Sequence, residues 1–133
     1  MKKTLILTIL FLIFVCQAGA FAAPTGTRRA NLTNSQIQTI SSTLDNFDLK
    51  IHTKSLFSPE ENEELFVIKS KLDKQMSKKP EVSLAPLYYK AGKVFRAREY
   101  NKEALDCYQT VIENFGNTIY AQKSKKELAR MGK

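Results

Sequence analysis

Apolar residues recur at helical spacing through most of the chain after residue 33. The first stripe advances by three, four, three and four residues, as one face of an α-helix requires, and consists of Ile37, Ile40, Leu44, Phe47 and Ile51. It resembles a coiled-coil seam but lasts only about two heptads, which is too short to support a coiled coil alone. We therefore expect this helix, capped by Thr33 or Asn34, to face the protein's own core. Oligomerisation through residues 37–51 is the alternative.

A second helix is predicted from its start signal. Ser58 can cap it, Pro59 suits the first turn, and Glu61 completes a capping box. Pro80 ends the helix near residue 79, because proline cannot continue it. The apolar stripe between these limits consists of Leu65, Ile68, Leu72 and Met76.

Three more helices are expected, at about 83–98, 101–115 and 118–131, with Gly116 and Asn117 forming the last turn. The final helix carries one face made of Ala121, Ser124, Leu128 and Met131. No segment alternates as a β-strand would, and the chain has only five glycines and four prolines, which disfavours a turn-rich β-sandwich. The pattern predicts an all-α protein, with residues 34–57 as an amphipathic helix and loop and residues 58–133 as a helical domain.

The N-terminus has the parts of a secretory signal peptide in their usual order. Lys2 and Lys3 are followed by an apolar run, Leu5 to Val15, and then by the small residues Ala18, Gly19 and Ala20. We predict cleavage after residue 20, or after Ala22, and a flexible linker over residues 21–33. The alternative is an uncleaved anchor over residues 4–23 in the inner membrane. Export would place the mature chain in the periplasm or cell envelope.

Seven spaced positions in residues 85–118 resemble a tetratricopeptide repeat: Tyr88, Ala91, Gly92, Phe95, Ala104, Tyr108 and Val111. The unit has the 34-residue period of that family. Gly92 and Ala104 are small, so two helices can approach closely. We expect larger side chains to fill the space between them, namely Tyr88, Phe95, Leu105, Tyr108 and Ile112. Val111 and Gly116 depart from the small residue and the proline that the family carries at those two positions.

The resemblance implies a helical hairpin that stacks with neighbouring helices and binds another protein or a peptide on its concave side. A single repeat cannot bury its own faces, so the helices at 58–79 and 118–131 would cover it. The family has no chemistry of its own. A non-enzymatic adaptor or scaffold of the bacterial envelope is therefore expected, and a membrane-anchored accessory subunit is the alternative.

One side of the helix at 83–98 carries the candidate binding residues. Tyr89, Lys93 and Arg96 are spaced by four and three residues, and Lys126 of the last helix is a further candidate. The resemblance assigns this side to the ligand, and the two basic residues suggest an acidic partner that Arg96 could hold through a carboxylate. The alternative is a solvated basic face.

Composition limits other chemistry. The chain carries a formal net charge of +8, one histidine and two cysteines. No acid–base pair or metal-ligand spacing suggests an enzyme, a metal site or a cofactor. His52 is expected in a loop, and Cys107 as a packed or surface thiol whose role stays open. Nucleic acid is not an expected partner of an exported chain, whereas anionic lipid head groups or envelope polymers are.

Overall fold

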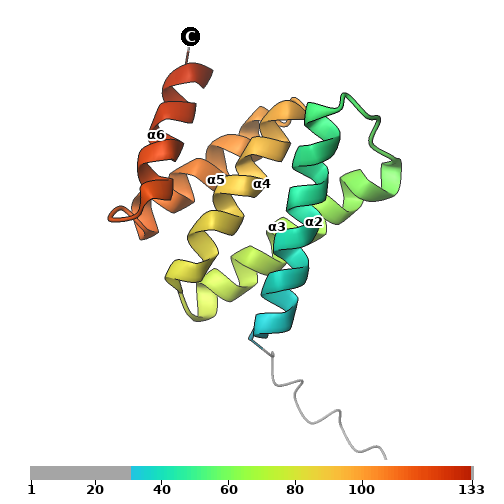
Figure 1. The fold of residues 1–133 in the computed structure, drawn as a ribbon. Coiled ribbons are helices and arrows are strands. Elements are labelled where there is room, and N and C mark those ends of the chain that lie inside the picture. The colour runs from blue at the N-terminus through green and yellow to red at the C-terminus, as the bar shows by residue number, and fades with distance from the viewer. Residues whose placement is uncertain (1–30, 133) are drawn as a thin grey trace, which may run out of the picture. The chain divides into compact units, whose positions relative to one another are not determined.

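The computed structural model describes residues 31–132, which contain five α-helices and no β-strand (Figure 1). The helices are α2 (Asn34–His52), α3 (Pro59–Lys78), α4 (Ala85–Ala97), α5 (Asn101–Asn114) and α6 (Ile119–Met131), and a 3₁₀ turn spans Val82–Leu84. The prediction of an all-α fold, with a helical hairpin flanked by packing helices, is confirmed. The predicted signal peptide and the alternative anchor lie outside the described residues. In the described part, none of the helices has the length and apolar character needed to cross a bilayer.

Two helices begin with a capping box. At α3, the Glu61 backbone N–H donates to Ser58 Oγ at 3.2 Å, and the Ser58 N–H donates to Glu61 Oε2 at 2.8 Å, as the sequence predicted. At α2, Thr33 and Gln36 form the same pair of bonds, so Thr33 rather than Asn34 is the cap. The predicted linker ends before residue 33, because the Leu32 N–H donates to the side chain of the buried Gln75.

The apolar stripe of α2 faces the protein's own core. Ile40, Leu44 and Phe47 are buried, and Ile37 and Ile51 are partly buried against them. The stripe is therefore covered within one chain, as expected, and oligomerisation through it stays a prediction to be tested. On α3, Leu65, Ile68 and Leu72 are buried in the same way.

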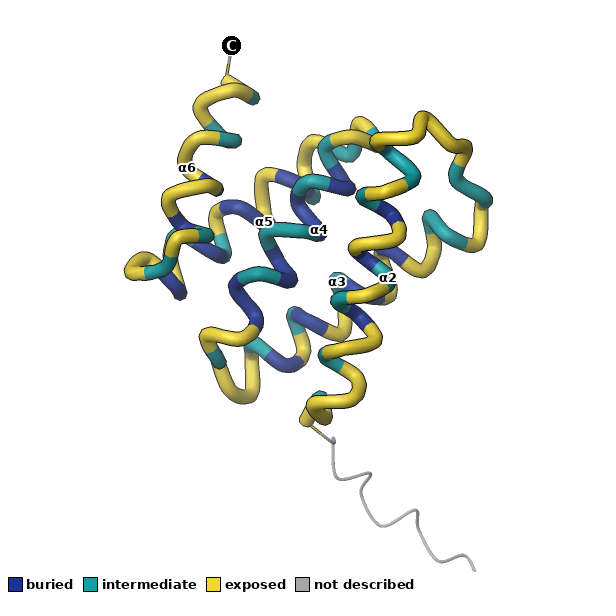
Figure 2. Tube along the Cα trace, in the orientation of Figure 1, coloured by how far each residue is buried: buried dark blue, intermediate teal, exposed yellow. Residues whose placement is uncertain are grey.

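Helix α4 lies at the centre and packs against each of the other four helices (Figure 2). Of its thirteen residues only Ala97 is exposed. Helix α2 crosses one side of α4, and α6 packs on α5 and α4, where Ala121 and Ser124 are buried. The side chains of Phe66 on α3 and Phe95 on α4 stack edge to face, with ring centroids 5.2 Å apart. Helices α3 and α6 thus cover the hairpin, as expected.

The α4–α5 hairpin brings its two helices close at Gly92. A Cβ atom placed on Gly92 would lie 2.7 Å from Cε1 of Tyr108, closer than carbon atoms approach without strain. All seven repeat positions named above are buried. The turn between the helices depends on Glu99, whose φ of 65° is left-handed, and Tyr100 packs there against Phe66 at 5.1 Å between ring centroids.

Two side chains expected between the helices are placed differently. Leu105 is 41% exposed and Ile112 is only partly buried. The buried face of α5 consists instead of Ala104, Cys107, Tyr108 and Val111. Because each residue turns the helix by about 100°, Leu105 lies one position past this face and points outward.

Candidate interaction groove

A groove runs along α4 where α2 and α6 flank it on opposite sides. It contains a pocket of about 310 Å³ whose wall comes from four helices. The lining residues are Asp48, Ile51 and His52 of α2, Lys93, Arg96 and Ala97 of α4, Tyr108 of α5, and Glu127 of α6. Two of the predicted binding residues, Lys93 and Arg96, therefore lie in one pocket.

Both basic residues of the pocket are neutralised by acids from neighbouring helices. Lys93 Nζ lies 2.8 Å from Asp48 Oδ1, and the Arg96 guanidinium donates to Glu127, which also accepts from Arg130 at 2.9 Å. The side chains of these two pairs are between 15% and 38% exposed, so solvent screens them only in part. The sequence suggested a basic surface, but the pocket holds alternating positive and negative charges.

Tyr108 is one of the residues that line the pocket. It is fully buried, and its hydroxyl, like that of Ser124, has no hydrogen-bond partner among the described residues. Burial, and then the charge of Glu127, raise the pKa of the phenol, so the hydroxyl stays protonated and available as a donor. A buried polar group left without a partner costs about 1–3 kcal/mol. The absence of a side chain at Gly92 gives the Tyr108 ring its space, so the repeat motif itself positions this hydroxyl.

Tyr89 does not line this pocket, but it packs against Tyr108, which does. Its ring lies 6.0 Å from that of Tyr108 and 5.8 Å from that of Tyr120, centroid to centroid. Lys123 Nζ lies 5.9 Å from the Tyr89 ring and 5.6 Å from the Tyr120 ring, within range of a cation–π contact. Tyr89 is half-buried, and its role as a flat apolar contact for a partner stays a prediction.

Lys126 does not join the other candidates. It is exposed, does not line the pocket, and makes no hydrogen bond or ion pair within residues 31–132. Glu127 and Lys123, its near neighbours on α6, make the contacts with Arg96 and Tyr89 instead. Lys126 and Glu127 are consecutive residues, and the sequence alone does not show which of them faces Arg96.

His52 was expected in a loop but is the last residue of α2 and lines the pocket. Its Nδ1 lies 2.8 Å from the backbone oxygen of Asp48. Within residues 31–132, no group of three His, Cys, Asp or Glu side chains is placed to hold a metal ion.

A second polar cluster lies between α3, α4 and α5, away from the groove. Lys69 Nζ lies 2.8 Å from Asp73 and 2.6 Å from Asp106, and the Tyr88 hydroxyl donates to Asp73 Oδ1 at 2.8 Å. Burial opposes the charge on Lys69, but its hydrogen bonds to Asp106 and Asp73 outweigh that effect and raise its pKa. The sequence analysis did not identify this cluster, although the four-residue spacing of Lys69 and Asp73 on one helix is a signal for that pair. The cluster ties three helices together.

Cys107 is buried beside this cluster. Burial raises the pKa of its thiol to about 12, so it is not a thiolate at neutral pH. Of the two positions expected for Cys107, packed or on the surface, the structure shows the packed one.

Searches of family models, curated proteins and solved structures found no match to this chain. The resemblance of residues 85–118 to a tetratricopeptide repeat therefore depends on its seven sequence positions, and the groove has to be interpreted from its own geometry.

Proposed function

We propose that this chain is an exported, non-enzymatic interaction module of the cell envelope, with a tetratricopeptide-like hairpin that holds a segment of a partner protein in the groove between α2, α4 and α6. The observation that carries the proposal is the buried Tyr108 hydroxyl, which has no partner among the described residues and belongs to a residue that lines a pocket with two ion pairs. A peptide carbonyl or carboxylate entering the pocket would supply the missing acceptor.

The ion pairs decide what kind of partner the groove favours. An acidic side chain of a partner can reach Lys93 or Arg96 only by displacing Asp48 or Glu127, so one carboxylate replaces another. Such an exchange gains little free energy by itself. The net affinity would then come from the Tyr108 hydrogen bond and from apolar contact with Ile51 and Ala97. We therefore expect a polar or acidic peptide segment to bind with only a modest dependence on salt.

Replacing Tyr108 by Phe tests the proposal, because it removes only the hydroxyl. Loss of a buried polar atom without a partner should stabilise the free protein by about 1–3 kcal/mol, whereas loss of the donor should weaken partner capture. The expected result is thus a higher melting temperature together with weaker capture, measured by crosslinking in native membranes followed by quantitative mass spectrometry.

Tyr88→Phe is the matched control. The Tyr88 hydroxyl is bonded to Asp73 in the other polar cluster, away from the groove. This variant should lose stability but keep the partners that the wild-type chain captures. If Tyr108→Phe captures the same partners at wild-type levels, the groove is not the binding site.

A further inference from the structure

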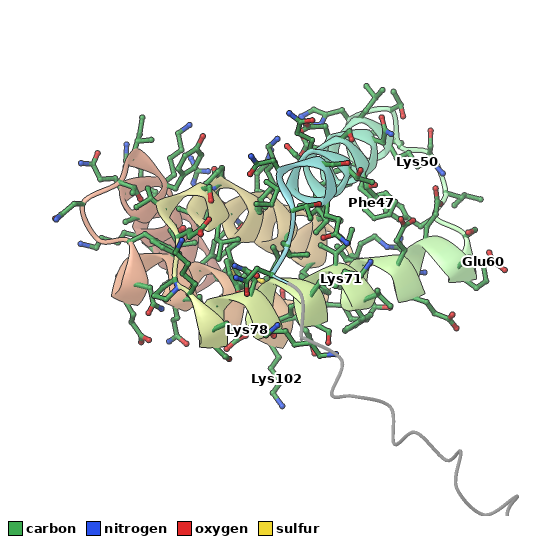
Figure 3. All side chains as sticks on the ribbon, turned by 90° about the horizontal axis from the view of Figure 1, so that it is seen from below. Phe47, Lys50, Glu60, Lys71, Lys78 and Lys102 are labelled. Atoms are coloured by element: carbon green, nitrogen blue, oxygen red, sulfur yellow. The ribbon has the colours of Figure 1, made fainter. Side chains whose placement is uncertain are left out.

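The outer side of α3 is divided into an acidic half and a basic half. Figure 3 shows Glu60 near one end of the helix and Lys71 and Lys78 towards the other. The acids Glu60, Glu61, Glu63 and Glu64 all lie in the first two turns. Lys71, Lys74 and Lys78 follow at steps of three and four residues, so they share one face, and all three are exposed. We name this surface the α3 lysine face.

The acids nearest in sequence to this face already have other partners. Asp73 lies between Lys71 and Lys74 along the helix, but its Oδ2 accepts from Lys69 and its Oδ1 accepts from Tyr88. Beyond the end of the helix, Glu81 is 2.9 Å from Lys79. Lys71 and Lys74 make no hydrogen bond or ion pair within residues 31–132. Their charges are thus presented to solvent.

The chain enters the folded domain at the same place. The Leu32 N–H donates to Gln75 Oε1 at 2.8 Å, and Gln75 lies one residue after Lys74 on α3. Any membrane attachment through the segment before residue 31, which includes the apolar run Leu5–Val15, would therefore connect to the domain beside the α3 lysine face.

We propose that the α3 lysine face lies against an anionic lipid surface. It is the outward side of a single helix, so its lysines can contact a flat array of head groups together. Lys71 and Lys74 are both exposed, so their ammonium groups are accessible to such head groups. Each lysine near an anionic bilayer contributes a similar increment of binding, which adds up over the face. The inference does not depend on the groove, because none of these residues lines that pocket.

The test measures binding to two kinds of lipid vesicle. The chain is expressed with its natural leader and purified with the N-terminus that the cell leaves on it. Its affinity is compared on vesicles of phosphatidylcholine and on vesicles in which part of that lipid is replaced by phosphatidylglycerol. An apolar anchor would bind both kinds of vesicle, so the difference between the two affinities measures the contribution of lipid charge.

The double variant Lys71→Gln with Lys74→Gln should bind anionic vesicles about 30-fold more weakly, at roughly 1 kcal/mol for each lysine removed. The control is Lys125→Gln with Lys126→Gln, which removes the same charge from two exposed lysines of α6 that also form no ion pair in the described part. It should stay within about threefold of wild type. Circular dichroism should show both variants folded.

Three outcomes would overturn the proposal. Equal losses in both variants would mean that net charge, and not this face, governs binding. The wild-type chain binding both kinds of vesicle equally would show that lipid charge is not recognised. Tighter binding to a soluble polyanion such as dextran sulfate than to anionic vesicles would indicate a polymer partner instead.

Discussion

Gly92 is expected to matter because of one neighbour, the ring of Tyr108. Replacing it with Ala adds a Cβ atom 2.7 Å from Cε1 and 3.0 Å from Cδ1 of that ring. Carbon atoms in contact normally lie about 3.5–4.0 Å apart, so the ring must move by roughly 1 Å. Tyr108 is fully buried, and overpacking of this kind costs about 1–3 kcal/mol.

A second effect opposes the first. Alanine favours the helical state over glycine by about 1 kcal/mol in a helix interior. The free energy of unfolding of Gly92→Ala should therefore fall by only about 0–2 kcal/mol, so this variant alone is a weak test. The interaction energy between positions 92 and 108 is a stronger test. In a Tyr108→Leu background the clashing ring atoms are gone, so Gly92→Ala should become stabilising by about 1 kcal/mol.

Urea unfolding of the four proteins in this cycle measures the coupling directly. We expect a coupling of about 1–3 kcal/mol between the two sites. Gly132→Ala provides a control, because its new Cβ would meet the Leu128 oxygen at an ordinary 3.7 Å. The reasoning is refuted if Gly92→Ala changes stability by the same amount with and without the Tyr108 ring.

Two other predictions concern the core. Replacing Ile40 and Phe47 by Ser should lower the free energy of unfolding by several kcal/mol while light scattering still shows the mass of the wild-type protein, because these residues are covered within one chain; a change in oligomeric mass would mean that the stripe also joins chains. Cys107 should react with a thiol reagent at pH 8 far more slowly in the native protein than in urea, since burial raises its pKa to about 12; equal rates would contradict its buried position.

The local features of the fold could be predicted, because each depends on residues close in sequence. The Ser58–Glu61 capping box and the stripe of α2 are examples, and both are confirmed. Leu105 was placed wrongly because it is adjacent to the buried Ala104, and the spacing of apolar residues does not fix the edge of a helix face to within one residue. Seven positions at the right spacing were enough to predict the close contact at Gly92.

The groove could be predicted only in part. Tyr89, Lys93 and Arg96 share a helix, so their common side follows from spacing. Their partners do not, because Asp48 is 45 residues from Lys93 and Glu127 is 31 residues from Arg96. Only the packing of α2 and α6 on α4 brings these acids to the bases. The missing partner of the Tyr108 hydroxyl is likewise a property of the folded molecule and has no sequence signal.

The central position of α4 also determines the order in which the helices can pack during synthesis. The apolar face of α2 is covered largely by α4, and Asp45 and Asp48 of α2 pair with Lys90 and Lys93. A nascent chain that has emerged only as far as α3 therefore lacks both the apolar cover and the counterions of α2. Folding can begin only after α4 emerges, and α5 can then join it through contacts that are close in sequence and form quickly. Until α4 emerges, residues 34–78 lack these packing partners and stay accessible to chaperones.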